Sequence, residues 1–564
     1  MSKDLLHERK DFENVRHLIE WAGETYGEKA AYSFRRNPKD EITTVSFTQL
    51  RDDVRALGSY MLANGFAGKH CSIIAKCCYE WVVAYFATLS IGGVLAPLDR
   101  DWAKEDLADT VAKADAKFLI CEEELAEKAE YIAEKVQLEA EPIYLLTKEQ
   151  GGGLSAIIEA GRAIYAENPD AFHGVEIDPD KLSLLVFTSG TTGKGKGVML
   201  SQTAILSDLS SVIPYVAFRE KTVGVLPPHH TYGSSVMFIG HAMIGTEIYI
   251  SSGLRYIQRE MKEQRPGHLV LVPLYLETFY RKIQANIKEK GKEKLVRKMI
   301  KVSNALRKVG IDLRKKFFGE IRAAFGGEVT MIISGGAPIN PEILSFFEAI
   351  GISTLNGYGI TECAPIVAVN RTKNVVPGSV GNILDIDTVK IDEPNEDGEG
   401  EICVKGSNVM LGYYKDESAT ADAMTEDGYF RTGDYGKVDK NGVLYITGRK
   451  KNLIILSNGK NVYPEEIENE LVATPGVQDI IVYEGQSKRG MEYNAIVAEI
   501  FPDADYISKN GITDVRAHLK PYIDAYNKTA VAYKKIGVLK VRTEDFPKNT
   551  LRKIQRFKLD MSID

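Results

Sequence analysis

The sequence predicts an α/β protein of more than one domain. With 564 residues, the chain is too long for a single hydrophobic core. Through most of the first 350 residues, segments with helical periodicity alternate with short apolar segments. The amphipathic stretch 51–64, followed by the strand-like stretch 71–75, is one example. This alternation is typical of parallel sheets covered by helices.

The remaining elements extend this pattern and then change it. A strand at 117–121 precedes a helix at 122–138. From about 378 to 447, short strands are punctuated by glycines, which predicts a β-rich subdomain. The charged connector GRKKN at 448–452 leads into a mixed α/β segment. We therefore expect an N-terminal domain at 1–448, a hinge at 449–452 and a C-terminal domain at 453–564.

Composition and charge argue against several classes of protein. Hydrophobic residues make up 44% of the chain and charged residues 26%, as in ordinary globular proteins. The net charge of −7 gives no reason to expect nucleic acid as a partner. The six cysteines contain no C-x-x-C pair, which favours reduced thiols in the cytoplasm. The first 15 residues are charged throughout and lack the apolar stretch of a signal peptide.

One apolar segment has the minimum length of a membrane span. Residues 81–98 form an uncharged run of 18 residues. Gly92, Gly93 and Pro97 interrupt this run, however. We therefore expect a buried helix that leads into a buried strand, and a soluble protein.

The stretch TSGTTGKGKG at 188–197 follows the apolar run LLVF and carries the strongest chemical signal. Its glycines and hydroxyls allow backbone N–H groups to form a concave site for oxyanions, and its lysines neutralise charge. It is not a Walker A loop, because Ser189 replaces the first glycine and Gly195 follows Lys194. A stretch of this composition is by itself more often a simple surface loop. Its interpretation as a phosphate site depends on the segments that follow.

Several later segments offer groups that would complete a nucleotide site. Gly335 and Gly336 follow an apolar strand, so a flat ligand can approach the backbone there. The segment NGYGITE at 356–362 offers an aromatic face, a hydroxyl and a carboxylate after another short strand. Ligands of α/β sheets bind at the carboxyl ends of strands, so these segments would converge on one crevice. Each segment alone has an ordinary structural explanation; their joint occurrence favours a binding site.

Two more groups fit the same ligand. Asp434 would hold ribose hydroxyls, and Arg449 would hold a phosphate or the ribose edge. Near the C-terminus, Lys553 lies on a short basic stretch. Without a role in binding, Asp434 would simply form a turn, and Lys553 would be a solvated surface charge.

The whole series of segments resembles the AMP-forming adenylating superfamily of acyl-CoA synthetases and firefly luciferase. The resemblance rests on TSGTTGKGKG, LPPHHTYG, SGGAPI, GYGITE, YFRTGDYG, GRKKNLIILSNGKNVYPEEIE and PKNTLRKIQR. TECAPIVAVN with PGSVG, and GSNVMLGYYKDESATADAMTEDGYFRTGD, are most similar to bacterial long-chain fatty acid–CoA ligases. The resemblance implies a large domain of two α/β lobes and a β-barrel, hinged to a small α+β domain.

The resemblance also implies a two-step reaction. A carboxylate attacks the α-phosphate of ATP to give an acyl-adenylate and pyrophosphate, and the thiol of coenzyme A then displaces AMP. Mg²⁺ uses few protein carboxylates, and the expected ligands are Glu362 and the hydroxyl of Thr188. The resemblance implies that ATP is held by Thr188, Ser189, Gly190, Thr191, Thr192, Gly193, Lys194, Gly335, Gly336, Ala337, Pro338, Asn356, Gly357, Tyr358, Gly359, Thr361, Asp434, Arg449 and Lys553.

The catalytic residues that the resemblance implies are Lys553, Glu362, Thr361 and His230. The ammonium of Lys553 would stabilise charge between the carboxylate and the α-phosphate. Thioester formation would need a second orientation of the small domain, reached by rotation at Lys451. In that orientation, coenzyme A would contact Ser457, Asn458, Gly459 and Lys460.

His230 would lie where the acyl group meets the incoming thiol, although a packing role is about as plausible. His229 takes its place if the alignment shifts by one residue. No acidic residue occurs from 227 to 244, which disfavours an amino-acid substrate. The chain departs from the family at Gly195, where proline is usual, and at Arg552, where glycine is usual.

The segment 281–322 is strongly basic, with 15 lysines and arginines against four acidic residues. Apolar residues recur at helical spacing, so one face is expected to pack and another to be cationic. A solvated helix face is the simpler explanation; contact with an anionic membrane or an acyl carrier protein is the functional one. The predicted packed face consists of Leu295, Met299, Val302, Leu306 and Val309.

Together these features predict an ATP-dependent, AMP-forming fatty acid–CoA ligase of the cytoplasm, on the inner face of the membrane if the basic segment binds lipid. A ligase that delivers acyl groups to an acyl carrier protein is the alternative among enzymes. The alternative that is not an enzyme is a catalytically silent relative that binds a nucleotide or an acyl group.

Overall fold

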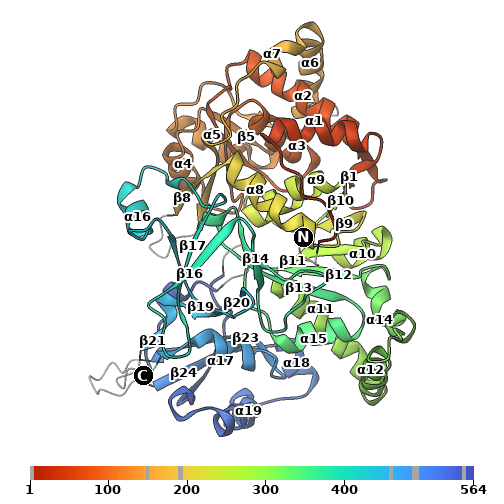
Figure 1. The fold of residues 1–564 in the computed structure, drawn as a ribbon, viewed down its shortest axis with the longest axis vertical. Helices are drawn as coiled ribbons and strands as arrows, with labels where there is room; N and C mark the ends of the chain where they lie inside the picture. The colour runs from red at the N-terminus through yellow and green to blue at the C-terminus, as the bar shows by residue number, and fades with distance from the viewer. Residues whose placement is uncertain are drawn as a thin grey trace.

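The computed structural model describes residues 5–147, 152–188, 195–455, 461–485, 495–548 and 554–563. Two α/β lobes and an antiparallel region occupy the upper and middle parts of Figure 1, and the last part of the chain lies below them. Among the described helices, none has both the length and the hydropathy that a bilayer crossing needs.

A seven-stranded sheet forms the centre of the first lobe. Its inner strands are parallel and almost wholly apolar, as expected for strands that are covered on both faces. The sheet order is β18 (Gly412–Tyr413), β8 (Lys196–Ser201), β7 (Leu182–Thr188), β4 (Val94–Leu98), β3 (His70–Ile74), β5 (Phe118–Cys121) and β6 (Ile143–Tyr144).

Helices cover both faces of this sheet, and alternate residues of each strand contact opposite layers. The first face carries α1 (Val15–Tyr26), α2 (Phe47–Ala63), α3 (Tyr79–Ser90), α6 (Leu154–Glu167), α7 (Pro169–His173) and α8 (Gln202–Val212). The other carries α4 (Lys104–Lys113), the short η1 (Glu123–Leu125) and α5 (Ala126–Lys135). The predicted helices at 51–64 and 122–138 are confirmed. The run 81–98 is a fully buried α3 followed by the buried β4, as predicted.

The second lobe contains a four-stranded sheet and the parallel part of a nine-stranded sheet. The four-stranded sheet has the order β2 (Thr43–Ser46), β1 (Ala30–Phe34), β10 (Glu247–Ile250) and β9 (Lys221–Gly224). The π-helix η3 (Tyr232–Gly240) and α9 (His241–Ile244) connect β9 to β10. The parallel strands of the larger sheet are β11 (His268–Leu271), β12 (Met331–Ser334) and β13 (Ser353–Gly359).

The antiparallel strands continue from β13 within the same nine-stranded sheet. Their order is β14 (Ile366–Val369), β15 (Gly381–Ile383), β20 (Val443–Arg449), β19 (Phe430–Val438), β17 (Gly400–Gly406) and β16 (Asp387–Asp392). These strands confirm the predicted β-rich region. The short strand β18, followed by α16 (Glu417–Asp422), leaves this region and pairs with β8 of the first lobe.

One local expectation is wrong. Residues 356–359 were expected in a loop after a strand, but they form the second half of β13. The first half of β13 pairs with β12 in parallel, and the second half pairs with β14 in antiparallel orientation. The chain reverses direction at η5 (Thr361–Cys363), so that β14 can pair with the second half of β13 as a hairpin. The strand therefore joins the parallel and antiparallel parts of the sheet.

The last part of the chain has its own hydrophobic clusters. Their side chains come from Ile454 onward, whereas the three clusters of the preceding part end at Leu444. Helix η6 (Lys450–Asn452) lies between the two parts. The elements beyond it are β21 (Ile454–Ile455), β22 (Asn461–Val462), α17 (Pro464–Leu471), β23 (Val477–Gly485), β24 (Ala495–Pro502), α18 (Ala504–Lys509), α19 (Val515–Thr529), η7 (Ala532–Lys534), β25 (Val538–Val541) and η8 (Arg556–Lys558).

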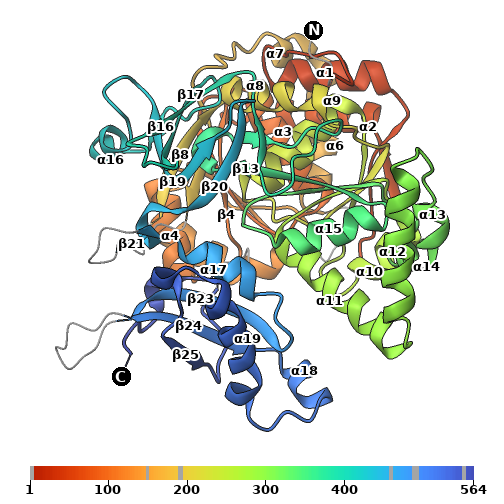
Figure 2. The same cartoon turned by 60° about the horizontal axis from the view of Figure 1, so that its bottom comes forward.

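The basic segment forms helices at the edge of the second lobe (Figure 2). They are α11 (Pro273–Glu289), α12 (Glu293–Arg307), α13 (Arg314–Phe317) and α14 (Gly319–Arg322), near α10 (Ile257–Gln264) and α15 (Pro341–Ala349). The predicted packed face of α12 is wrong for Leu295, Val302 and Val309, which are exposed.

The face of α12 that packs consists of Val296, Met299, Ile300 and the buried Ser303. Apolar residues cover more of this helix than a single stripe, so the sequence pattern fits two orientations. In the structure, the face of α12 that packs against the core is rotated about the helix axis by about 100° from the predicted face. This rotation corresponds to a shift of one residue along the sequence.

Candidate active site

The carboxyl ends of strands from both lobes surround a cavity of about 970 Å³. Segments that follow β3, β4, β9 and β10 line it, together with Phe187 near the end of β7. This is the position at which α/β sheets bind ligands. Lys548 and Gln555 of the last part of the chain also line the cavity. These two residues flank 549–553, and Lys548 pairs with Ile554.

Glu362 lies in η5, directly after the β13 strand, and its carboxylate is held by a tyrosine. The hydroxyl of Tyr413 donates to Oε1 of Glu362 at 2.9 Å. Burial raises the pKa of the Glu362 carboxyl, while the bond from Tyr413 and the charge of Arg449 oppose that rise. Nζ of Lys196 lies 4.5 Å from the centre of the Tyr413 ring. A carboxylate, a phenol and an ammonium therefore meet at this point.

Sequence reasoning missed Tyr413. It lies 51 residues from Glu362, within the GYYKDE stretch that contributed only to the family resemblance. The structural cause is β18, in which Tyr413 pairs with Val198 of β8. Strand β8 follows the 188–197 stretch, so Tyr413 connects Glu362 to that stretch.

Thr188 is the last residue of β7 and pairs with Lys196 across the β7–β8 hairpin. Its hydroxyl donates to the carbonyl oxygen of Lys196 at 3.4 Å. The other predicted residues of this stretch lie outside the described residues: Ser189, Gly190, Thr191, Thr192, Gly193 and Lys194. At Gly195, where the family usually has proline, a Cβ would lie 2.6 Å from the carbonyl oxygen of Thr188.

Asp434, Arg449 and Tyr358 form a connected group. Asp434 and Arg449 are cross-strand partners in β19 and β20, and Nε of Arg449 lies 3.0 Å from Oδ1 of Asp434. The hydroxyl of Tyr358 donates to Oδ2 of Asp434 at 2.7 Å. The neighbouring carboxylate raises the pKa of the Arg449 guanidinium, and burial raises that of the Tyr358 phenol. Asp434 is therefore fixed from both sides.

The charge of Glu362 also raises the pKa of Arg449, and Asp434 raises that of Glu362. The predicted metal-binding carboxylate and the predicted ribose-binding pair thus lie close enough to interact electrostatically. Thr361 precedes Glu362 in the same short helix. The structure brings these predicted residues together.

Most of the remaining predicted ATP contacts lie after the end of β12 and along β13. Gly335 is buried, whereas Gly336, Ala337 and Pro338 are exposed. Gly336 has a φ of +87°, which favours glycine. The Asn356 side chain donates to the carbonyl oxygen of Ser379 at 3.2 Å.

Of the two glycines beside Tyr358, Gly359 is the more constrained. Added to Gly359, a Cβ would lie 2.0 Å from the carbonyl oxygen of Pro365, which is closer than real Cβ contacts. Gly357 tolerates a Cβ with contacts of 3.3 Å or more. The second half of β13 therefore approaches the returning chain closely at Gly359.

His229 and His230 line the cavity with their ring centres 4.3 Å apart. Burial lowers the pKa of His229 to about 4 and that of His230 to about 3, so both imidazoles are neutral at neutral pH. Nε2 of His230 has no hydrogen-bond partner among the described residues. This nitrogen is itself buried, so the ring lines the cavity without exposing Nε2.

Asp99 supplies an acidic group that sequence reasoning missed. It follows β4, and its Oδ2 lies 3.7 Å from Nε2 of His229. The absence of acidic residues from 227 to 244 therefore does not keep carboxylates away from this part of the cavity. A carboxylate from the first lobe takes that place, and local sequence inspection could not find it.

The predicted hinge lies between the two parts of the chain. Lys451 is in η6, and burial together with the charge of Arg449 lowers the pKa of its ammonium. Lys553, Ser457, Asn458, Gly459 and Lys460 lie outside the described residues. No group of three or more His, Cys, Asp or Glu side chains within the described ranges is arranged to hold a metal ion.

A family model described as AMP-binding enzyme matches residues 19–414, which is more than half of the chain. The chain belongs to this family. Among its curated relatives is the long-chain-fatty-acid–CoA ligase 6 of Homo sapiens, 29% identical, with 86% of this chain and 74% of that protein covered. The long-chain-fatty-acid–CoA ligase FadD15 of Mycobacterium bovis is 28% identical, with 78% and 75% covered.

Solved structures of AMP-binding enzymes share the fold. The ATP-bound MatB of Rhodopseudomonas palustris has a TM-score of 0.74 at 24% identity, covering 96% of this chain and 97% of that one. The anthranilate CoA ligase AuaEII, in complex with anthranoyl-AMP, has the same TM-score at 18% identity. The predicted fold class is confirmed.

Proposed function

We propose that this chain activates a medium- or long-chain fatty acid with ATP and transfers the acyl group to coenzyme A. The observation that carries the proposal is the position of Glu362, held by Tyr413 and electrostatically coupled to Asp434 and Arg449. The names of the curated relatives support a fatty acid as the substrate.

In the first step, an oxygen of the fatty acid carboxylate attacks the α-phosphorus, and pyrophosphate leaves. In the second, the sulfur of coenzyme A attacks the acyl carbonyl and AMP leaves, while the thiol proton passes to solvent. The enzyme must overcome repulsion between two anions in the first step. Cationic and hydrogen-bond donors placed in advance reduce that barrier.

The nucleotide would lie across the ends of β7, β12 and β13. Its ribose hydroxyls would bind Asp434, which Arg449 and Tyr358 hold in place. Its base would lie against the exposed backbone of Gly336 and the side of Tyr358. Thr361 would contact the α-phosphate, and the 188–197 stretch would hold the β- and γ-phosphates.

Mg²⁺ fits the donors that are present. Mg²⁺ in nucleotide sites takes one or two protein oxygens, and phosphates and water complete its shell. Oε1 of Glu362 accepts a bond from Tyr413, which leaves Oε2 as the oxygen that would face the metal. Glu362, with the hydroxyl of Thr188, would hold the ion, which neutralises phosphate charge when bound.

Two orientations of the small domain would serve the two steps. Lys548 and Gln555 line the same cavity as His230, which supports an orientation in which the last part of the chain faces the acyl site. We assign Lys553 to adenylation in this orientation. Rotation within 449–452, at Lys451, would replace it with the 457–460 segment for the thiol step.

His230 would shape the place where the acyl group meets the thiol. Its neutral ring avoids a fixed cation beside the substrate carboxylate, and its Nε2 has no hydrogen-bond partner among the described residues. The cavity lining also contains Asp99, several cations and apolar side chains such as Phe187 and Leu226, and the apolar side chains would contact an acyl chain.

The deciding experiment measures AMP and pyrophosphate release with carboxylates from acetate to oleate, with and without coenzyme A. We expect AMP turnover that requires coenzyme A and an acid of medium or longer chain. Pyrophosphate release without stimulation by coenzyme A would assign the acyl group to a carrier protein instead. Absence of any acid-dependent release would contradict the proposal.

We place the enzyme in the cytoplasm, and at the inner face of the membrane if the basic segment binds lipid. All six cysteines are free, which fits a reducing compartment. The basic segment 281–322 is the surface that would contact an anionic partner, either lipid or an acyl carrier protein.

A further inference from the structure

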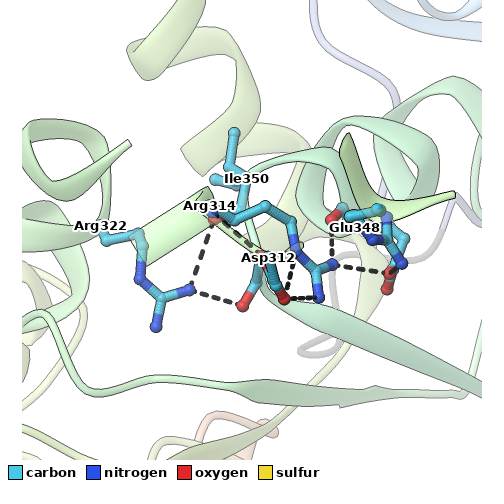
Figure 3. Close-up of polar contacts among 7 residues, drawn as sticks. Asp312, Arg314, Arg322, Glu348 and Ile350 are labelled. Carbon is cyan, nitrogen blue, oxygen red and sulfur yellow. Dashed lines mark hydrogen bonds and ion pairs between the residues drawn. The ribbon is translucent and has the colours of Figure 1, made fainter. Parts of the chain in front are cut away.

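The cations of the basic segment 281–322 separate into an inner and an outer set. The inner set faces the second lobe and is paired. The Arg314 guanidinium donates three hydrogen bonds to the Asp312 carboxylate and also donates to the Glu348 carboxylate at 2.9 Å (Figure 3). Arg307 donates to the same carboxylate at 2.9 Å. These bonds attach the segment to the end of α15.

Arg322 completes the inner set. Its Nη1 donates to the carbonyl oxygen of Gly351 at 2.5 Å, and its Nη2 donates to that of Val329 at 2.8 Å. The side chain is buried, and Figure 3 shows it directed toward the backbone of Ile350. The inner cations are therefore structural and are not available to a partner.

The outer set lies on the opposite face of α12. Lys294, Lys298, Lys301 and Lys308 recur at spacings of three, four and seven residues, so they share one side of the helix. All four are exposed. Within the described part of the chain, no carboxylate forms an ion pair with any of them. Four like charges thus face solvent without compensation.

Apolar side chains lie beside these lysines. Leu295 is 52% exposed, Val302 43%, Val309 71% and Ile311 47%. These are four of the 11 large hydrophobic side chains that are exposed among the described residues, and they fall within 17 positions. Scattered exposed apolar residues are normal, but a cluster of them marks an interaction surface.

A hollow next to this cluster has a matching chemistry. A cavity of about 450 Å³ lies between α11, α12 and α14, and Leu295 contributes to its lining. Its wall contains apolar side chains such as Phe279 and Phe317, and its lysines Lys290 and Lys292 are paired with Glu320. The hollow therefore matches the exposed cluster in its apolar side chains.

We propose that the α12 surface docks on an anionic lipid bilayer. We define this surface as Lys294, Leu295, Lys298, Lys301, Val302, Lys308, Val309 and Ile311. Lysines next to exposed apolar residues are the composition of helices that lie in the headgroup region, where the apolar side chains enter the lipid and the cations contact headgroups. An acidic protein would pair with the lysines but would not by itself account for the exposed apolar cluster.

The consequence for catalysis rests on the proposed function: a fatty acid dissolved in the bilayer would be available next to the enzyme. The docking itself does not depend on catalysis. It is therefore tested by flotation of the full chain with vesicles of phosphatidylcholine alone and with vesicles that contain 30% phosphatidylglycerol.

We expect at least about tenfold stronger partitioning to the anionic vesicles, and a decrease as the salt concentration rises. Lys294→Glu/Lys298→Glu/Lys301→Glu/Lys308→Glu should reduce partitioning by more than about tenfold. Leu295→Ser/Val302→Ser/Val309→Ser should also reduce it while leaving the charge unchanged. The matched control, Lys135→Glu/Lys181→Glu/Lys509→Glu/Lys528→Glu, makes the same charge change at exposed positions elsewhere and should retain most binding.

Equal flotation with both kinds of vesicle, or equal loss in the α12 variant and the control, would overturn the proposal. So would retention of an acidic acyl carrier protein, lost in the α12 variant, without vesicle binding. AMP release from water-soluble octanoate checks that each variant is folded and active. Flotation without any acid-dependent AMP release would contradict the proposed function but leave the docking proposal standing.

Discussion

The imidazole rings of His241 and His268 are stacked in the core of the second lobe, with their Nε2 atoms 3.0 Å apart. The backbone N–H of Arg219 donates to Nδ1 of His268, so the proton of this ring must be on Nε2. That proton is donated to Nε2 of His241, whose Nδ1–H donates to the carbonyl oxygen of Val236. The chain of bonds requires both rings to be neutral.

This pair predicts loss of stability in acid. Burial lowers the pKa of His241 to about 4 and that of His268 well below its usual value. In the unfolded chain, these two histidines bind protons at about pH 6.5. The stability that the pair contributes is therefore fully present above that pH and is lost as the pH falls toward 4. Urea unfolding midpoints at pH 7.5 and 5 should differ more for the native chain than for His241→Leu/His268→Leu.

The control for this comparison is His173→Gln, at an exposed histidine, which should keep the native pH dependence. An equal pH dependence in the native chain and in the double variant would show that the pair does not titrate as described.

Removal of the Tyr413 hydroxyl should weaken adenylation. Tyr413→Phe keeps the ring next to Lys196 but removes the bond to Glu362. Hydrogen bonds to charged groups contribute about 1.5–3 kcal/mol, so kcat/KM for pyrophosphate release should fall roughly tenfold to a hundredfold. The required Mg²⁺ concentration should rise. Tyr414→Phe, which removes a bond to Asp115, is the matched control and should leave the Mg²⁺ dependence unchanged.

Neutralisation of Asp434 should impair nucleotide binding. Asp434→Asn keeps the shape but removes the charge that pairs with Arg449. We expect the KM for ATP to rise about tenfold or more, with little change in the KM for the fatty acid. Isothermal titration with AMP measures the same loss without catalysis. Asp422→Asn, at an exposed position, should bind AMP normally; unchanged binding by Asp434→Asn would remove Asp434 from the site.

Lys553 should be needed for only one half-reaction. Lys553→Ala should slow acyl-adenylate formation by about 10²–10³ because one preorganised cation is lost. It should still convert supplied acyl-adenylate and coenzyme A to the thioester. Lys509→Ala, in the same part of the chain, should preserve both steps. Equal loss of both half-reactions would contradict the two-orientation proposal.

Local sequence patterns predicted most elements, because helical or strand periodicity requires only near neighbours. The buried α3–β4 unit and the β-rich region were found in this way. The packed face of α12 was not, since its orientation depends on side chains of other helices. The position of Asn356 and Tyr358 within β13 was missed, because the pairing with β14 makes that segment extended.

The candidate site also combines residues that the sequence could identify with residues that it could not. Chemical groups in recognisable motifs, such as Glu362 and Asp434, could be named from the sequence. Their partners could not, because Tyr413 and Asp99 approach only after distant strands pair. The neutral state of His230 also follows from burial, which no local pattern reveals.

The pairing of β18 with β8 has a consequence for dividing the chain into fragments. A fragment that ends before Gly412 would leave β8 as an uncovered edge strand of the first lobe. Open edges of this kind promote association between copies. A soluble split version of the protein should therefore keep residues up to at least Tyr414 in the first piece, and a cut after Asn452 should preserve both lobes intact.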